Sequence, residues 1–154
     1  MDFRQLTAKV RSLTRDFTNS IFRENDIQDF INESIMRIKQ VVPELRSMER
    51  LIAPDQKPSL LPEQYHHLLS IYAISRCFAQ DERHYQATTY MNEFEVKLEE
   101  MKSLIEAGDL IIVDEDGKEL VSDNFIDYVN LRPYHITETK RTFDEDDGVE
   151  GVVG

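Results

Sequence analysis

Three histidines mark the places where a metal site would first be sought. His66 and His67 are adjacent in an apolar stretch, and His84 lies in a short polar segment. Adjacent residues of a helix point about 100° apart, whereas two ligands on one helix need a spacing of three or four residues. We therefore interpret all three as surface histidines and predict no metal site.

Two acidic turns have the composition of calcium-binding loops. They are the segments 114–117 (DEDG) and 144–148 (DEDDG). An EF-hand loop needs oxygen ligands at its first, third and fifth positions, glycine at the sixth and glutamate at the twelfth. With Gly117 as the sixth position, Ile112 falls at the first and Asp123 at the twelfth. The pattern fails at its opening ligand, so we interpret these segments as solvated turns.

Catalytic motifs are absent from the sequence. No Ser/His/Asp arrangement, glycine-rich phosphate loop or Cys/His cluster has workable spacing. The single cysteine, Cys77, lies in an apolar run, where a thiol behaves as a small hydrophobic group and has no partner for a disulfide within the chain. We predict that the protein is not an enzyme and takes no cofactor, although an active site completed by a partner chain stays an alternative.

The charge of the chain is unevenly distributed. Of the formal net charge of −12, residues 1–60 carry +1, residues 61–108 carry −4 and residues 109–154 carry −9. Such a balance argues against the phosphate contacts that hold proteins to nucleic acid. No apolar run approaches the roughly 20 residues of a bilayer span, and the first residues do not resemble a secretion signal. We expect no specific nucleic-acid binding, no membrane association and synthesis in the cytoplasm.

Two long apolar repeats between Pro62 and Gly108 are the scaffold of the predicted fold. The first covers more than half of a helix circumference, which predicts a central helix covered on several sides. The second forms one seam, and the polar segment 80–84 between them predicts a reversal into an antiparallel helical hairpin. Pro62 suits the first helical position and Gly108 the left-handed residue that ends a helix. The seam consists of Ala87, Met91, Phe94, Leu98, Met101 and Ile105.

Two helices are predicted before this hairpin. Apolar spacing predicts a helix over about residues 2–15, with Phe3, Leu6, Val10 and Leu13 on one face. Phe17 and Ile21 would continue this face, but Thr18, Asn19, Ser20 and Asn25 compete with helix by bonding their own backbone, so a break is predicted within 17–25. A second helix is predicted to begin with Asp26 as N-cap and to end before Pro43. Its apolar face is Ile27, Phe30, Ile31, Ile35, Ile38 and Val41, and the segment 44–61 that follows is predicted to be a connecting loop.

The predicted fold class is mainly α: a small helical bundle around the long antiparallel helical hairpin, with a short β-hairpin and an extended C-terminal arm. The β-hairpin is predicted from the apolar runs 110–113 and 120–121 on either side of an acidic turn. We divide the chain into a helical domain (1–108), a β-hairpin and connecting segment (109–133) and an acidic arm (134–154) that is flexible or docks on a partner.

The order of these parts resembles the head-to-tail connector proteins of tailed bacteriophages, also called adaptor or head-completion proteins. The resemblance covers about residues 20–108. It is carried by Ile31-Asn32-Glu33 in the second helix and by the pattern LP…Y..LL..Y at the start of the hairpin. The residues of that pattern are Leu61, Pro62, Tyr65, Leu68, Leu69 and Tyr72.

The resemblance implies a structural virion protein at the head-tail interface. Its subunits would form a ring, usually a dodecamer, beneath the portal protein and would extend the DNA channel toward the tail or stopper protein. The C-terminal segment would grip the portal. A hypothetical portal or subunit interface then comprises Tyr128, Leu131, Tyr134, Ile136 and Phe143. The alternative is a small acidic helical regulator that binds a basic protein partner, although mixed charges four residues apart on the hairpin weaken this reading.

Overall fold

The computed structural model describes residues 1–18 and 20–121, and its fold is mainly helical. Four α-helices follow one another: α1 (Phe3–Thr14), α2 (Glu24–Val41), α3 (His67–Gln80) and α4 (His84–Glu106). Short 3₁₀ turns cover Pro43–Leu45 and Glu63–Tyr65. The described residues up to Leu120 form one compact unit.

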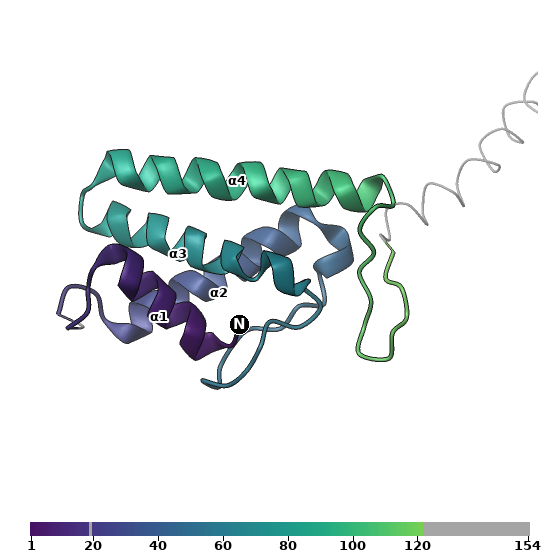
Figure 1. The fold of residues 1–154 in the computed structure, drawn as a ribbon, viewed down its shortest axis with the longest axis horizontal. Helices are drawn as coiled ribbons and strands as arrows, with labels where there is room; N and C mark the ends of the chain where they lie inside the picture. Colours follow the sequence, from purple (N-terminus) through teal and green to yellow (C-terminus); the bar gives the residue numbers. More distant parts are fainter. Residues whose placement is uncertain (19, 122–154) are drawn as a thin grey trace, which may run out of the picture. The chain divides into compact units, whose positions relative to one another are not determined.

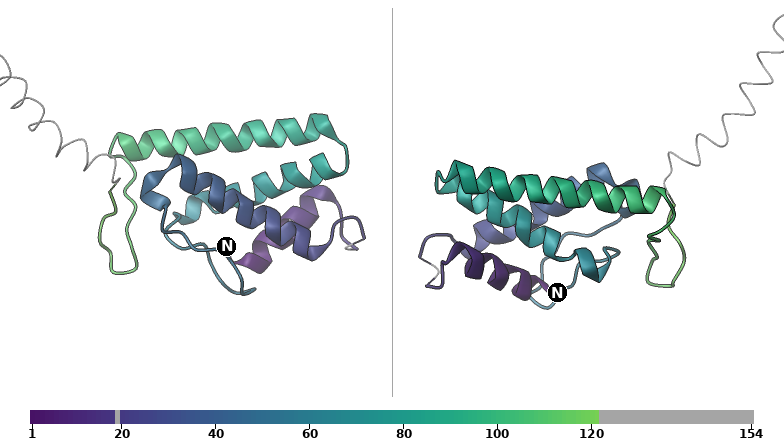
Figure 2. Two further views of the ribbon diagram at one scale, coloured as in Figure 1. Left: turned by 180° about the vertical axis from the view of Figure 1, so that it is seen from behind. Right: turned by 45° about the horizontal axis from the view of Figure 1, so that its top comes forward.

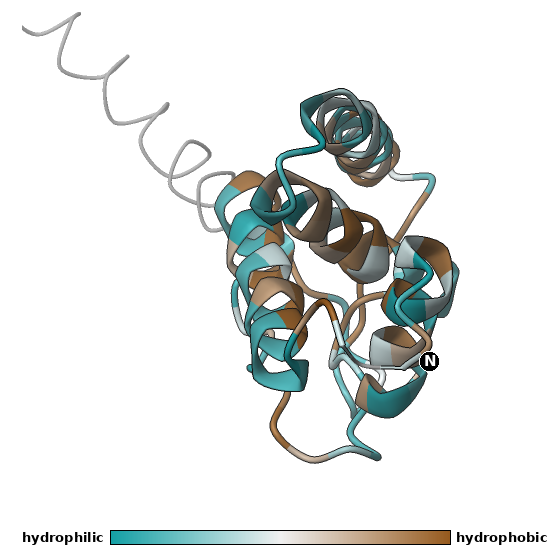
Figure 3. Cartoon of the chain, turned by 90° about the vertical axis from the view of Figure 1, so that its left-hand side faces the viewer, coloured by the Kyte–Doolittle hydropathy of each residue, from teal (hydrophilic) through white to brown (hydrophobic). Residues whose placement is uncertain are grey.

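α3 is the central helix, as its broad apolar surface predicts. It packs against α4 on one side and against α1 and α2 on the other (Figures 1 and 2). Seen end-on, the apolar residues of the helices gather around α3 (Figure 3). Within α3 the side chains of Leu68, Leu69, Ala73, Ile74 and Cys77 are fully buried.

The reversal between α3 and α4 lies in the polar segment where the sequence predicts it. α3 ends at Gln80, α4 begins at His84, and Glu82 between them has a positive φ of 60°. The seam of α4 is also confirmed, since Ala87, Phe94, Leu98 and Met101 are buried and Met91 and Ile105 are packed against the core. Gly108 ends this helix with φ +82°, in the left-handed region that glycine adopts without strain.

The starts of two helices differ from the prediction. α2 begins at Glu24 with Arg23 as N-cap, so Asp26 lies in the first turn and its carboxylate binds Arg23 at 3.2 Å. A carboxylate there is still favourable, because it faces the positive end of the helix dipole. Pro62 does not begin α3; it precedes the 3₁₀ turn Glu63–Tyr65, and the α-helix follows from His67.

The end of α1 also differs from its predicted apolar face. The helix stops at Thr14, and Arg15 takes a left-handed conformation with φ 61°. The predicted break is therefore present, but Leu13 is exposed rather than buried, and Phe17 and Ile21 lie on the surface of the following loop. The loop, and not a longer helix, connects α1 to α2.

A buried ion pair closes this loop. The guanidinium of Arg11 donates to the carboxylate of Asp16 at 2.8 Å and to the backbone carbonyl of Phe22 at 3.1 Å. The Asp16 carboxylate also accepts the backbone N–H groups of Ser20, Ile21 and Phe22. Burial alone would raise the pKa of Asp16, but these N–H groups and the Arg11 charge together lower it below its ordinary value.

The segment after α2 is a loop that carries part of the core. Leu45, Met48, Leu51 and Leu61 are all buried beneath the helices. Beyond α4, Ile112 is buried as well, although no regular strand forms in the described part of the chain. The predicted β-hairpin is reduced to a single bridge between Val113 and Glu119.

Candidate functional site

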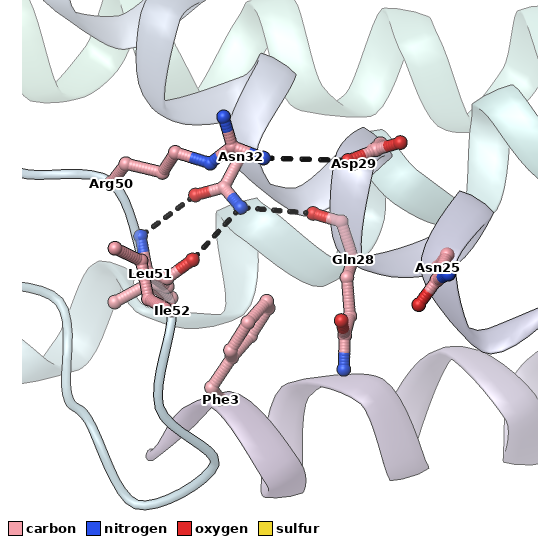
Figure 4. A pocket seen from close by; sticks show the side chains of 8 residues that line it. All are labelled: Phe3, Asn25, Gln28, Asp29, Asn32, Arg50, Leu51 and Ile52. Atoms are coloured by element: carbon pink, nitrogen blue, oxygen red, sulfur yellow. Dashed lines mark hydrogen bonds and ion pairs between the residues drawn. The ribbon is translucent and has the colours of Figure 1, made fainter.

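A groove runs along α2 on the surface of the described unit. Two hollows of about 450 and 410 Å³ share Asp29, Asn32 and Arg50 in their linings, and together they form what we call the α2 groove. Figure 4 shows the first of the two. α2 forms one wall, and the segment 48–52 forms the other. Its lining includes Phe3, Gln28, Ile35, Met36, Lys39, Met48, Leu51 and Ile52.

Asn32 fixes the separation of the two walls. Its side-chain amide donates to the Leu51 carbonyl at 3.1 Å, and its oxygen accepts the Leu51 N–H at 2.8 Å. The amide group thereby pairs with the loop backbone in the way that a neighbouring β-strand would. It also donates to the Gln28 carbonyl at 3.2 Å, so all these polar groups are already satisfied (Figure 4). Asn32 therefore holds the loop against α2.

The rim of the α2 groove is apolar and exposed. Ile52 has 79% of its surface accessible and Met36 has 56%, whereas Met48 and Leu51 beneath them are buried. The Arg50–Asp29 ion pair, at 3.6 Å, connects the two walls near the surface. Exposed apolar side chains above a pre-formed hollow are suited to contact with another protein surface.

A network of charged side chains connects α2, α3 and α4. Glu33 pairs with Arg76 at 3.2 Å and accepts a hydrogen bond from the Tyr72 hydroxyl at 3.4 Å. Arg37 binds Glu95 through two parallel hydrogen bonds of 3.1 and 2.9 Å. Burial and the Glu33 charge raise the pKa of Tyr72, so its hydroxyl stays protonated and serves as a donor. The charges compensate one another and hold the three helices together.

His66 is not a surface histidine, which corrects the prediction. It is buried, its Nε2 lies 2.9 Å from the Leu61 carbonyl, and its Nδ1 lies 2.9 Å from the amine of Met1. An ammonium group can only donate, so Nδ1 accepts and Nε2 carries the proton. Burial lowers the pKa of His66, which favours this neutral form. His84 is exposed and His67 half-buried.

The first acidic turn uses its carboxylate to close itself. The Asp114 side chain accepts the N–H groups of Asp116 and Lys118 at 2.9 and 2.8 Å, and Gly117 has φ +82°. Within residues 1–18 and 20–121 no group of three or more His, Cys, Asp or Glu side chains is placed to hold a metal ion. The second acidic turn, 144–148, lies outside the described residues.

The outward side of α4 is a second exposed surface. Tyr85 has 83% of its surface accessible and Val96 has 67%, on the side of the helix opposite to Phe94. α4 contacts α3 extensively and α2 only slightly, so most of its circumference has no cover in the described unit. Sequence periodicity found the inner seam of α4, but gave no reason to examine its outer side.

The five predicted interface residues, Tyr128, Leu131, Tyr134, Ile136 and Phe143, lie outside the described residues. None of the described helices is both long and apolar enough to span a bilayer. No family model, curated protein or solved structure matches this chain.

Proposed function

We propose that this protein is a head-to-tail adaptor of a tailed bacteriophage, a structural virion protein without enzymatic activity. Its subunits assemble as a ring, a dodecamer by resemblance, between the portal and the tail or stopper protein. The DNA passes through the ring. The observation that carries this proposal is α4, a helix of 23 residues that packs by one seam and leaves its other sides for neighbours.

The α2–loop–α3 arrangement supports the same proposal. Asn32 and Glu33, which belong to the motif that suggested the family, are both committed to contacts within the bundle. A rigid bundle suits a ring subunit, because a subunit that is already ordered loses less conformational entropy on assembly. The bundle is thus suited to act as a repeated building block.

The acidic C-terminal region supplies the proposed attachment to the portal. Residues 109–154 carry thirteen acidic and four basic side chains, and Tyr128, Leu131 and Tyr134 lie among them. Apolar residues in an acidic arm can dock on another protein, whereas the excess of carboxylates repels phosphate. We propose that the arm binds the portal and that acid facing the channel keeps the passage of DNA free of tight contacts.

The experiment is electron microscopy of the purified chain mixed with portal rings from the same genome. The proposal expects portal rings extended by a second ring of this protein. A variant lacking residues 124–154 retains the described bundle and should lose portal binding, while its far-UV circular dichroism melt stays close to that of the full chain. Undecorated portal rings with the full chain would contradict the proposed function, and undiminished binding of the shortened chain would remove the role of the arm.

A further inference from the structure

We propose that Met1 and His66 form a pH-sensitive latch, in which protonation of the His66 imidazole releases Met1 from the bundle. The imidazole lies between Met1, which precedes α1, and Leu61, which precedes the 3₁₀ turn at the start of α3. The N-terminus is seen beside this part of the chain in Figures 1 and 2. All groups of the latch belong to one chain, so the latch goes beyond the proposed function and does not depend on it.

The two ring nitrogens of His66 make different kinds of hydrogen bond. Nε2 lies 2.9 Å from the Leu61 carbonyl, which can only accept, so Nε2 must carry a proton. Nδ1 lies 2.9 Å from the nitrogen of Met1. Neither an ammonium nor a peptide nitrogen accepts a hydrogen bond, so Nδ1 must accept and must be free of a proton. Both contacts can exist together only while the ring is neutral.

Protonation of the ring therefore affects the two contacts differently. The second proton is added to Nδ1, which then faces the N–H groups of Met1 and can no longer accept from them. The proton on Nε2 is kept, and its bond to the Leu61 carbonyl becomes charge-assisted and stronger. We expect Met1 to leave the ring while Leu61 stays bound to it.

The charges around His66 oppose a protonated ring that still holds Met1. The groups that act on the imidazole are the ammonium of Met1, Lys57 from the loop before the 3₁₀ turn, and Glu63 from that turn. Burial is the largest influence, and together with the two cations it outweighs Glu63 and the Leu61 bond and lowers the pKa of His66. When Met1 leaves, one cation is removed and water can reach Nδ1, so release and protonation favour each other.

The movement is confined to the first residue, because α1 has anchors of its own. The backbone N–H groups of Phe3 and Arg4 donate to carbonyls of the loop 54–56, each at 2.9 Å. The Asp2 side chain caps the first turn of α1, and the Phe3 side chain is buried. None of these contacts involves His66, so α1 should stay in place when Met1 leaves.

The turn 59–61 also depends on His66. Leu60 has a positive φ of 66°, a left-handed conformation that is unfavourable for a residue with a side chain. Leu61 donates its N–H to the Ser59 carbonyl at 2.7 Å, and its own carbonyl accepts from Nε2. Because the bond to Nε2 survives protonation, the turn and the buried Leu61 should not move with Met1.

Methionine methyl NMR of the full-length chain tests the latch. Labelling with methyl-¹³C methionine gives one signal for each of the five methionines. Met1 is packed against the core, Met48 and Met101 are buried in it, and Met36 is exposed. Spectra are recorded from pH 8 to pH 5, above the isoelectric point of about 4.7. The Met1 signal is identified by replacing each of the other four methionines by leucine in turn.

We expect the Met1 signal to move toward that of the exposed Met36 with a midpoint below pH 6.5, while the signals of the two buried methionines stay in place. His66→Gln should abolish this shift, because its amide can donate to one partner and accept from the other but does not titrate. The matched control is His67→Gln, at the adjacent half-buried histidine, and it should leave the shift unchanged.

Three results would overturn the latch. The first is a Met1 signal that stays constant down to pH 5, and the second is a shift that persists in His66→Gln. The third is a shift that occurs only together with those of Met48 and Met101, since this would indicate unfolding of the whole bundle. The first and third results come from the wild-type chain alone, so they decide the test even if His66→Gln does not fold.

Discussion

The ion pair between Arg11 and Asp16 gives the most demanding test of how the bundle is held together. Asp16→Ala removes a buried carboxylate and leaves the Arg11 guanidinium without its counter-charge. Nη2 of Arg11 already has no hydrogen-bond partner within the described residues, so little remains to compensate that charge. Three backbone N–H groups, those of Ser20, Ile21 and Phe22, lose their acceptor as well.

Breaking a buried pair of this kind costs about 3–5 kcal/mol, against a total stability of about 5–15 kcal/mol for a domain. We therefore expect the midpoint of thermal unfolding to fall by about 10–20 °C. Urea unfolding followed by far-UV circular dichroism measures the same loss as a shift in midpoint at constant slope. Asp55→Ala, at an exposed carboxylate of the loop 46–61, is the matched control.

The pH dependence of this difference has a definite sign. The pKa of Asp16 is lowered in the folded state, so its contribution is present above the unfolded value of 3.8 and is lost as the pH falls through the folded value. The stability difference between the wild type and Asp16→Ala should be constant near neutral pH and should shrink below about pH 4. A loss no larger than that of Asp55→Ala would refute the assignment of a stabilising role to the pair.

Three further predictions concern the core. Phe94→Ala should lower the free energy of unfolding by about 3–5 kcal/mol, measured by thermal melting, because Phe94 is fully buried and meets the Tyr72 ring edge-on at 5.1 Å. Val96→Ala, on the outer side of α4, should lower it by less than about 0.5 kcal/mol. Equal losses of stability would show that the seam does not face inward. The pKa of His66 is lowered in the folded state, so protons favour the unfolded chain and stability should fall as the pH drops below the unfolded value of 6.5. Urea midpoints measured across this pH range should depend less on pH in His66→Gln than in the wild type. His67→Gln, at a histidine whose pKa is also lowered, is the comparison. Cys77 should not react with a thiol reagent at about pH 8 until denaturant is added, because burial raises its pKa to about 12; rapid labelling of the folded chain would contradict this.

Apolar periodicity predicts best those helices whose buried residues follow one regular spacing along the sequence. The inner seam of α4 and the apolar face of α2 needed no knowledge of their neighbours, because any neighbour must cover them. Leu13 shows the limit of this reasoning. It continues the α1 pattern, yet the helix ends one residue later, and the position of α3 decides which turns of α1 are covered.

Polar residues that act across long separations could not be placed from the sequence. Asn32 is separated from Leu51 by 19 residues, and Arg37 from Glu95 by 58, so no local spacing indicates either pair. Asn32 lies at the edge of the apolar face of α2, beside Gln28 and Asp29, where a polar residue is expected, so its type and position gave no signal. For His66, the apolar residues near it in the sequence were the only indication that its imidazole is buried and neutral.

The motif that carries the phage resemblance makes contacts within the fold of a single subunit. Asn32 binds the loop that forms the α2 groove, and Glu33 joins α2 to α3 through Arg76, so both residues act within one subunit. A chain could therefore share this motif with adaptors because it shares their architecture, whatever it assembles with. Assembly must instead depend on residues that make no contacts within the subunit. Among the described residues, exposed apolar side chains of this kind include Tyr85 and Val96 on α4 and Ile52 and Met36 on the groove. If charged substitutions at these four positions leave both folding and ring formation unchanged, the subunits must join elsewhere, and the bundle alone gives no support to an adaptor.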